Sequence, residues 1–235
     1  ATGDESVAIT DVASGLAVTK VADVAAVPEP GGPVTYTVGI TNTSAVDDVV
    51  IDSIVDSVDG GAPFAAGGDC AGLLGTNLDP GATASCAFTL GVAGQPGDVV
   101  ADTVTVAGTD GDGAAVSGEA SETVDITDVG TTLLVTKQAS VASVPEPGGP
   151  VTFTVGITNV STVDTVSITS ITDSVSGGTP FPAGGTCADL VATQLEPGTS
   201  TSCAFTMDVS GGAGDVVADT VTVVGDDGDP DPVPD

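Results

Sequence analysis

The most constraining feature of this sequence is a repeat at one fixed offset. Lys20, at the end of Leu16-Ala-Val-Thr-Lys20, recurs 117 positions later as Lys137, and Pro28-Glu-Pro-Gly-Gly-Pro33 recurs at the same offset. That offset also pairs Cys70 with Cys187, Cys86 with Cys203 and Asp102-Thr-Val-Thr-Val106 with Asp219-Thr-Val-Thr-Val223. A single offset held over most of the chain predicts two homologous tandem domains.

Each copy is a series of short Val- and Thr-rich stretches separated by Gly and Pro, which is typical of an all-β fold. Val34-Thr-Tyr-Thr-Val-Gly-Ile-Thr41 alternates apolar and polar residues, as a strand with one buried face does. An Ig-like β-sandwich has about seven strands, so we expect two tandem sandwiches of that type. In the first copy, strands are expected near Leu16–Lys20, Val34–Thr41, Val49–Val55, just before Cys70, Thr83–Leu90, Val99–Val106 and Ser121–Val129.

The repeat is out of phase with the chain. Ile9-Thr-Asp-Val12 matches Ile126-Thr-Asp-Val129, so residues 6–12 have the sequence of a final strand but precede the first domain. The second copy ends at Asp235, the counterpart of Gly118, before its own final strand is expected to begin. We therefore divide the chain into an N-terminal strand (residues 1–12), a first repeat (13–129) and a second repeat that lacks its last strand (130–235).

Two explanations of this phase stay open. The chain is either an excerpt of a longer continuous array, or a subunit that joins other copies of itself head to tail. In the second case the N-terminal strand of one copy fills the open sheet edge of the next copy. A head-to-tail contact that does not close on itself makes a filament. The residues expected to make this contact are Ser6, Val7, Ile9 and Val12.

The charge balance excludes several partners. The chain has 2 Lys+Arg against 33 Asp+Glu and no His, which gives a formal net charge of −31. Nucleic-acid binding depends on Lys and Arg at the phosphates, and anionic lipid also attracts basic residues. No apolar run approaches the roughly 18 residues of a membrane span. We expect neither a nucleic-acid partner nor membrane insertion.

One segment in each copy resembles a known family. The segment is Val27-Pro-Glu-Pro-Gly-Gly-Pro-Val-Thr-Tyr-Thr-Val38, followed by Thr41-Asn42 and by Pro80-Gly81 before Cys86. It is similar to the Ig-like "conserved repeat" domains that form long arrays in prokaryotic cell-surface and adhesin-type proteins. The resemblance implies secretion, a sandwich fold and a role as a stalk or adhesive element.

The four cysteines recur as two pairs with the same spacing. Cys70 and Cys86 lie sixteen residues apart, as do Cys187 and Cys203. The even count and the absence of His favour disulfides within each repeat, because a zinc site would need ligands from both domains and no C-x-x-C pair exists. Such disulfides indicate an oxidising, extracellular compartment, at a cell surface if the resemblance holds.

Acidic residues gather in the loop that precedes the final strand of each copy. We expect the loop of the second copy to face the linker 128–132 and the Glu29 turn of the preceding domain, and Asp110 and Asp112 to face Asp11 in the same way. Carboxylates gathered at such a domain junction could hold Ca²⁺, which takes six to eight oxygen ligands. The alternative is an ordinary solvated acidic loop, and no other cofactor is expected. The candidate calcium ligands are Asp11, Glu29, Asp110, Asp112, Asp128, Asp226, Asp227 and Asp229.

Two further residue types recur at equivalent positions. Asn42 and Asn159 each begin an N-x-Ser sequon and are candidate glycosylation sites. Lys20 and Lys137 are the only basic residues. Each is expected either to form an ordinary salt bridge or to form an isopeptide bond to Asn42 or Asn159, assisted by a nearby carboxylate.

Catalysis has little support in this sequence. The chain lacks His and Arg, contains no nucleophile motif, and has few aromatic residues to line a carbohydrate cleft. We expect a non-enzymatic structural subunit or segment of an extracellular fibre or surface stalk. The alternative is an adhesin module that binds a glycan or protein through its loops.

Overall fold

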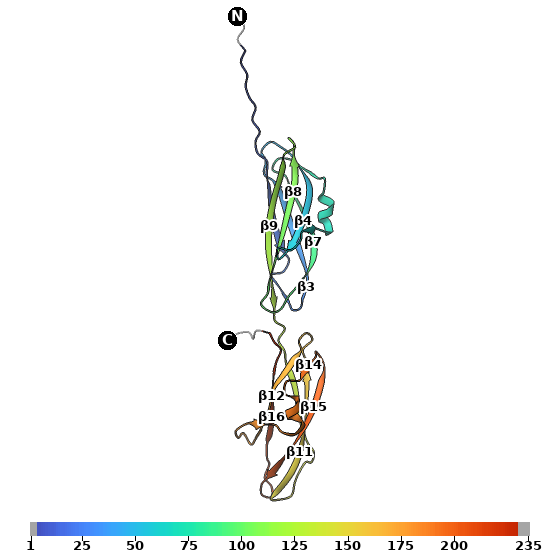
Figure 1. Ribbon diagram of the computed structural model, residues 1–235, viewed down its shortest axis with the longest axis vertical. Helices are drawn as coiled ribbons and strands as arrows, with labels where there is room; N and C mark the ends of the chain where they lie inside the picture. Colours follow the sequence, from blue (N-terminus) through green and yellow to red (C-terminus); the bar gives the residue numbers. More distant parts are fainter. Residues whose placement is uncertain (1–3, 230–235) are drawn as a thin grey trace. The chain divides into compact units, whose positions relative to one another are not determined.

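The computed structural model describes residues 4–229, and both of its compact units are β-sandwiches (Figure 1). Unit 1 comprises Ala1–Thr127 and unit 2 comprises Asp128–Asp235. The predicted all-β sandwich fold is confirmed. None of the helices in the described part of the chain is long and apolar enough to cross a membrane.

Unit 1 consists of two sheets. The first contains β1 (Leu16–Ala22), β3 (Gly31–Asn42) and β7 (Thr83–Ala93), in that order. The second runs in the order β2 (Ala26–Pro28), β9 (Ala115–Thr127), β8 (Val99–Asp110), β4 (Val49–Val58) and β5 (Phe64–Ala65), and β6 (Asn77–Leu78) also pairs with β4.

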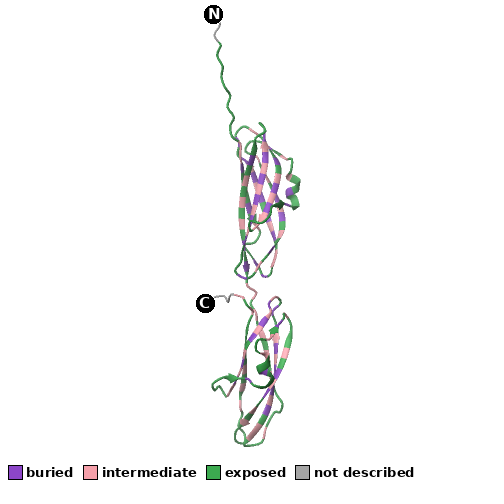
Figure 2. Ribbon diagram, in the orientation of Figure 1, coloured by how far each residue is buried: buried purple, intermediate pink, exposed green. Residues whose placement is uncertain are grey.

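Alternating residues of the facing strands form the core of unit 1. Val34, Tyr36, Val38 and Ile40 of β3 all have no exposed surface, and the residues between them point away from the core. The same alternation runs along β8 and β4, and Figure 2 shows it as buried and less buried residues taking turns along these strands. The period of two in the sequence therefore predicted the buried face correctly.

Unit 2 repeats this architecture with fewer strands. One sheet contains β10 (Leu133–Ala139), β11 (Gly148–Asn159) and β15 (Ser200–Ser210). In the other, β12 (Val166–Val175) pairs with β13 (Phe181–Pro182), β14 (Gln194–Leu195) and β16 (Asp219–Asp226). Within residues 128–229 there is no strand equivalent to β2 or to β9.

A short 3₁₀ helix in each unit brings the two cysteines together. Cys70 lies in the helix Gly68–Leu73 and bonds to Cys86 of β7, and Cys187 bonds to Cys203 in the same way. Gly68 has φ +57°, and a Cβ there would lie 2.4 Å from the carbonyl oxygen of Ala87, so only glycine fits this approach. Both predicted disulfides are present, and they indicate an oxidising compartment, extracellular or periplasmic.

The strand boundaries differ from the prediction at the end of unit 1. β9 begins at Ala115, six residues before the expected Ser121, because it forms a hairpin with β8 that pairs Thr109 with Ala115. Gly118 therefore lies inside β9 and does not precede it. The expected N-terminal strand is also absent, since residues 4–15 form no strand in the described structure.

Candidate functional site

Strand β9 closes the sandwich of unit 1. It pairs with β8 from Ala115 to Asp125 and runs parallel to β2 over three residues. Val124 and Ile126 of β9 are 0% and 2% exposed. Near its other end, a Cβ on Gly118 would lie 2.5 Å from the carbonyl oxygen of Leu16, so β9 packs closely against β1.

Unit 2 is open where unit 1 has β9. Within residues 128–229, β16 has a ladder with β12 only. β16 is eight residues long whereas its counterpart β8 has twelve, and Val216, just before β16, is 92% exposed. Residues 143–145, the counterparts of β2, are not in a strand. β9 therefore orders both of its neighbours in unit 1.

Unit 2 has a hollow at the position that the side chains of β9 occupy in unit 1. It has a volume of about 260 Å³, and its apolar lining includes Val144, Val151, Phe153, Val209 and Val217. The counterparts of these residues, Val27, Val34, Tyr36, Val92 and Val100, are all buried in unit 1. Val100 pairs directly with Val124 of β9.

A second hollow, of about 630 Å³, lies at the other end of β16. It is lined by Leu133, Val223 and Gly225 among other residues. The counterpart of Gly225 is Gly108, which pairs with Val116 of β9 in unit 1. The two hollows together therefore follow the path that β9 takes in unit 1.

The N-terminal segment has the apolar pattern that fits the first of these two hollows. Val7 and Ile9 are the counterparts of Val124 and Ile126, but they are 90% and 98% exposed. Val12 is 52% exposed, and Ser6 is also exposed. Figure 2 shows the described part of this segment as a continuous exposed stretch. Val7 and Ile9, two β-branched apolar residues, are thus exposed to solvent.

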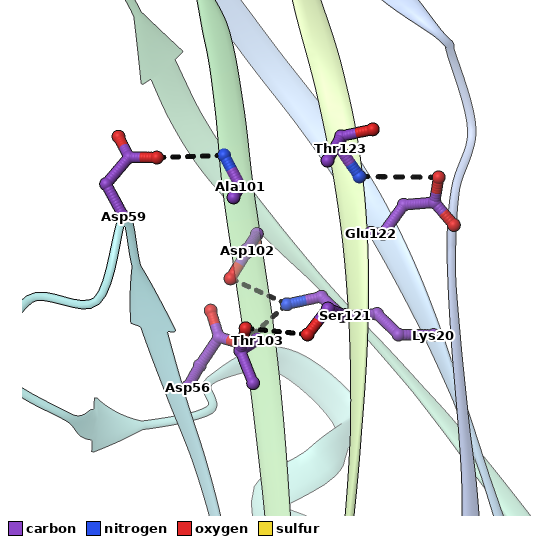
Figure 3. Close-up of polar contacts among 9 residues, drawn as sticks. All are labelled: Lys20, Asp56, Asp59, Ala101, Asp102, Thr103, Ser121, Glu122 and Thr123. Carbon is purple, nitrogen blue, oxygen red and sulfur yellow. Dashed lines mark hydrogen bonds and ion pairs between the residues drawn. The ribbon is translucent and has the colours of Figure 1, made fainter.

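A buried cluster of one lysine and two aspartates lies between the sheets of unit 1 (Figure 3). The amine of Lys20, on β1, is 2.6 Å from Oδ1 of Asp56 on β4 and 2.7 Å from Oδ1 of Asp102 on β8. All three side chains have no exposed surface. The amine also lies 4.4 Å from the ring centre of Tyr36 and 5.1 Å from that of Phe88.

The same cluster occurs in unit 2. Lys137 contacts Asp173 at 2.5 Å and Asp219 at 2.7 Å, beside the rings of Phe153 and Phe205. Burial raises the pKa of Asp56 to about 6, although Lys20 acts in the opposite direction. The pKa of Asp173 is raised for the same first reason. In both clusters, burial therefore favours the neutral form of one of the two carboxyl groups.

The isopeptide partner expected from the sequence was wrong. Lys20 lies opposite Val38 in the β1–β3 ladder, whereas Asn42 lies opposite Leu16, four residues away. The amide of Asn42 donates hydrogen bonds to the carbonyl oxygens of Asp47 and Leu78. Asn159 has the equivalent bonds, so both lysines contact aspartates and neither asparagine is available to them.

The prediction that Asn42 and Asn159 are glycosylation sites was also wrong. Asn42 and Asn159 have no exposed surface, and both amide hydrogens of each are used in internal hydrogen bonds. The side-chain oxygen of Asn42 accepts from the backbone N–H of Ser44. Each sequon therefore holds a turn in place, and its asparagine is not accessible to a glycan.

Part of the predicted acidic cluster forms in each unit. In unit 1, carboxylate oxygens of Asp11, Asp47 and Asp112 lie within 4.8 Å of one another. In unit 2, Asp164, Asp227 and Asp229 do the same. Repulsion from Asp47 and Asp11 raises the pKa of Asp112, and burial followed by repulsion from Asp164, Asp227 and Asp128 raises that of Asp229.

Three of the candidate calcium ligands also make local contacts within their own unit. Asp110 accepts hydrogen bonds from the backbone N–H groups of Ala114 and Asp112, and the first of these lowers its pKa. Asp226 accepts one from Gly228 in its own loop. Glu29 is buried in unit 1 next to β2, and its backbone N–H donates to Thr127. Calcium binding stays a prediction.

Sequence reasoning missed four aspartates of the lysine clusters and two of the acidic groups. Asp102 falls in the buried alternation of β8, between Val100 and Val104, where a carboxylate needs a partner. The chain has only two basic residues, Lys20 and Lys137, and each lies on the inward-facing side of the first strand of its copy. A charged aspartate and a lysine at inward-facing positions of the same copy could have predicted the ion pair. Asp47 and Asp164 carried no comparable signal, because loop positions do not follow a period.

Comparisons with known proteins do not place the chain in a family. No family model matches it, and no curated protein is similar to it. Among solved structures, it is similar to the secreted serine protease VesC from Vibrio cholerae, with a TM-score of 0.31, and to a red sea bream transglutaminase, with a TM-score of 0.30. Identity is 14% in both cases over 90% of this chain, which spans 51% and 29% of those proteins.

Proposed function

We propose that this chain is a non-catalytic structural subunit of an extracellular fibre or surface stalk. In this proposal, copies join head to tail when residues 4–12 of one copy add as a strand along residues 215–220 of another, that is, along the start of β16 and the segment just before it. The observation that carries the proposal is the match between the two parts. Val7 and Ile9 are exposed in the N-terminal segment, and unit 2 has an open hollow where unit 1 holds the equivalent side chains of β9.

Burial of these two side chains would supply part of the binding free energy. Full burial of a Val or Ile side chain contributes about 1.5–3 kcal/mol. An open strand edge offers backbone N–H and C=O groups with which an added strand can pair. The register follows from unit 1, where Val100 pairs with Val124 and Ala101 with Thr123. Val7 is then placed opposite Val217, and Ser6 opposite Ala218.

Charge works against this association. The segment carries Asp4, Glu5 and Asp11, and the whole chain has a net charge of −31. Two copies therefore repel each other until salt screens their charges, over about 10 Å at 0.1 M ionic strength. Assembly is expected to be stronger at higher ionic strength.

The test is the size of the protein in solution as a function of concentration. Sedimentation velocity of the full chain should show multimers that grow with protein concentration. Val7→Asp with Ile9→Asp should keep the protein monomeric, because two charges would enter the apolar hollow. Ala8→Asp is the matched control: it also adds charge, but Asp125 already occupies this position in β9. A wild-type chain that stays monomeric, or a double variant that assembles as the wild type does, would refute strand addition between copies.

A further inference from the structure

We propose that each lysine cluster matures into a covalent cross-link, with an amide bond between Lys20 and Asp102 in unit 1 and between Lys137 and Asp219 in unit 2. The folded protein itself supplies the reacting groups. This inference concerns the interior of each unit and does not depend on how copies are joined.

The first support is the placement of the only two basic residues. Both lysines of the chain lie in buried clusters with the same composition, and neither is used at the surface of a very acidic protein. A buried ion pair costs several kcal/mol of desolvation per ion. A neutral amide would remove one positive and one negative charge from the core.

The two aspartates of each cluster differ in their geometry toward the amine. Asp56 accepts a hydrogen bond from Lys20 at 2.6 Å. Asp102 is nearly as close, at 2.7 Å, but neither of its oxygens has a partner in hydrogen-bond geometry. Unit 2 repeats this asymmetry, with Asp173 hydrogen-bonded to Lys137 and both oxygens of Asp219 without such a partner. A hydrogen-bond donor approaches a carboxyl oxygen near the plane of the carboxyl group, whereas a nucleophile approaches the carboxyl carbon from outside that plane. We therefore assign Asp102 and Asp219 as the acceptors of the new bond.

Asp56 and Asp173 are then positioned to carry protons. The cluster starts with a lysine ammonium, one carboxylate and one carboxylic acid. The ammonium passes a proton to the carboxylate, and the free amine attacks Cγ of Asp102. A C–N bond forms, a C–O bond breaks, and the hydroxyl leaves as water after taking a proton from Asp56. Asp56 recovers a proton from the nitrogen, so the net change is ammonium plus carboxylate giving amide plus water.

The surroundings favour this step. The groups are held in contact by three different strands, and effective concentrations of well-oriented groups reach 10⁵–10⁸ M. The rings of Tyr36 and Phe88 exclude water from the amine, which favours its neutral form and the loss of water. The raised pKa of Asp56 is consistent with a carboxyl group that holds a proton near neutral pH.

The cross-link would connect the two sheets of each sandwich. Lys20 lies on β1 of one sheet and Asp102 lies on β8 of the other, so the bond encloses residues 21–101. A pulling force that enters at β1 would pass through the bond to β8 and would not unfold the enclosed residues. Such a connection suits a protein under tension.

The sharpest test uses the denatured, reduced chain, so that burial protects nothing. Trypsin cleaves only after free Lys or Arg, and this chain has two lysines and no arginine. The wild type should therefore resist trypsin completely, and its intact mass should be lower than the sequence mass by two water molecules. Asp102→Ala should restore one water and one cleavage, at Lys20, while the untouched second unit serves as the internal control. Asp219→Ala should restore cleavage at Lys137 only.

Three results would overturn the proposal. An unmodified wild-type mass with cleavage at both lysines excludes the bond. An Asp102→Ala chain that keeps both mass deficits excludes Asp102 as the acceptor. Fragmentation of the cross-linked peptide that places the bond on Asp56 reverses the roles of the two aspartates. The first and third of these results are measured on the wild-type chain, so they do not depend on how a variant folds.

Discussion

Val7 stands in the repeat at the position of Val124, yet Val124 is fully buried in unit 1 and Val7 is 90% exposed. The same side chain in the same local sequence is thus in a core in one place and in water in the other. The difference lies in the partner strand, since Val124 pairs with Val100 of β8. The counterpart of that partner, Val217, lines an open hollow in unit 2.

Strand β9 should contribute strongly to the stability of unit 1. Ile126→Ala is expected to lower the free energy of unfolding of this unit by about 2–5 kcal/mol, because it removes a side chain that is 2% exposed. Val224→Ala is the control: Val224 is 49% exposed, so its change should stay within about 0.5 kcal/mol. Chemical denaturation of the full chain measures both. Equal effects of the two substitutions would contradict the assigned role of β9.

Each disulfide should stabilise its unit. Cys70→Ser with Cys86→Ser opens a bridge between residues sixteen apart, for which loop entropy predicts a loss of about 3 kcal/mol. The corresponding pair in unit 2 should have the same effect on its own unit. The measurement is the shift of the denaturation midpoint for each double variant. Unchanged midpoints would mean that the 3₁₀ helices are held without their cysteines.

Stability should fall as the pH rises from about 4 to about 7. The pKa of Asp56 is raised to about 6 in the folded state, so the folded protein binds a proton there that the unfolded chain has already released. The folded state gains from this proton at low pH, and the gain is lost as the pH passes 6. The direction is the same if Lys20 forms an amide with Asp102, because burial, the largest cause of the raised pKa, remains. Melting temperatures across this range test the sign, and Asp56→Asn should flatten the profile.

Calcium binding is tested by the acidic group of unit 1. If Asp11, Asp47 and Asp112 bind Ca²⁺, the ion should raise the melting temperature and a chelator should reverse the effect, because the cation removes the repulsion among them. Asp112→Asn should abolish the response, and Asp79→Asn, at an exposed turn elsewhere in unit 1, should not. A melting temperature that does not respond to chelator refutes the prediction.

The sequence predicted the sandwich fold and the disulfide pairs because period-two alternation and cysteine spacing are local properties. It did not predict the strand β2, which depends on β9 for its pairing, or the start of β9 at Ala115, which depends on a hairpin. The partners of Lys20 were missed for a similar reason. Asp56 and Asp102 are distant in sequence and meet only when the two sheets pack.

The measurement that tests strand addition most directly is a cross-link in the expected register. In unit 1, Ala101 pairs with Thr123, so Ser6→Cys in one copy should face Ala218→Cys in the next. Thr222→Cys is the matched control, because it lies four residues further along, about 13 Å at 3.4 Å per residue, and disulfides do not span Cα distances beyond about 7 Å. On a non-reducing gel, Ser6→Cys with Ala218→Cys should give a ladder of covalent multimers, and Ser6→Cys with Thr222→Cys should not. Monomers from the first pair, or equal ladders from both, would contradict the account.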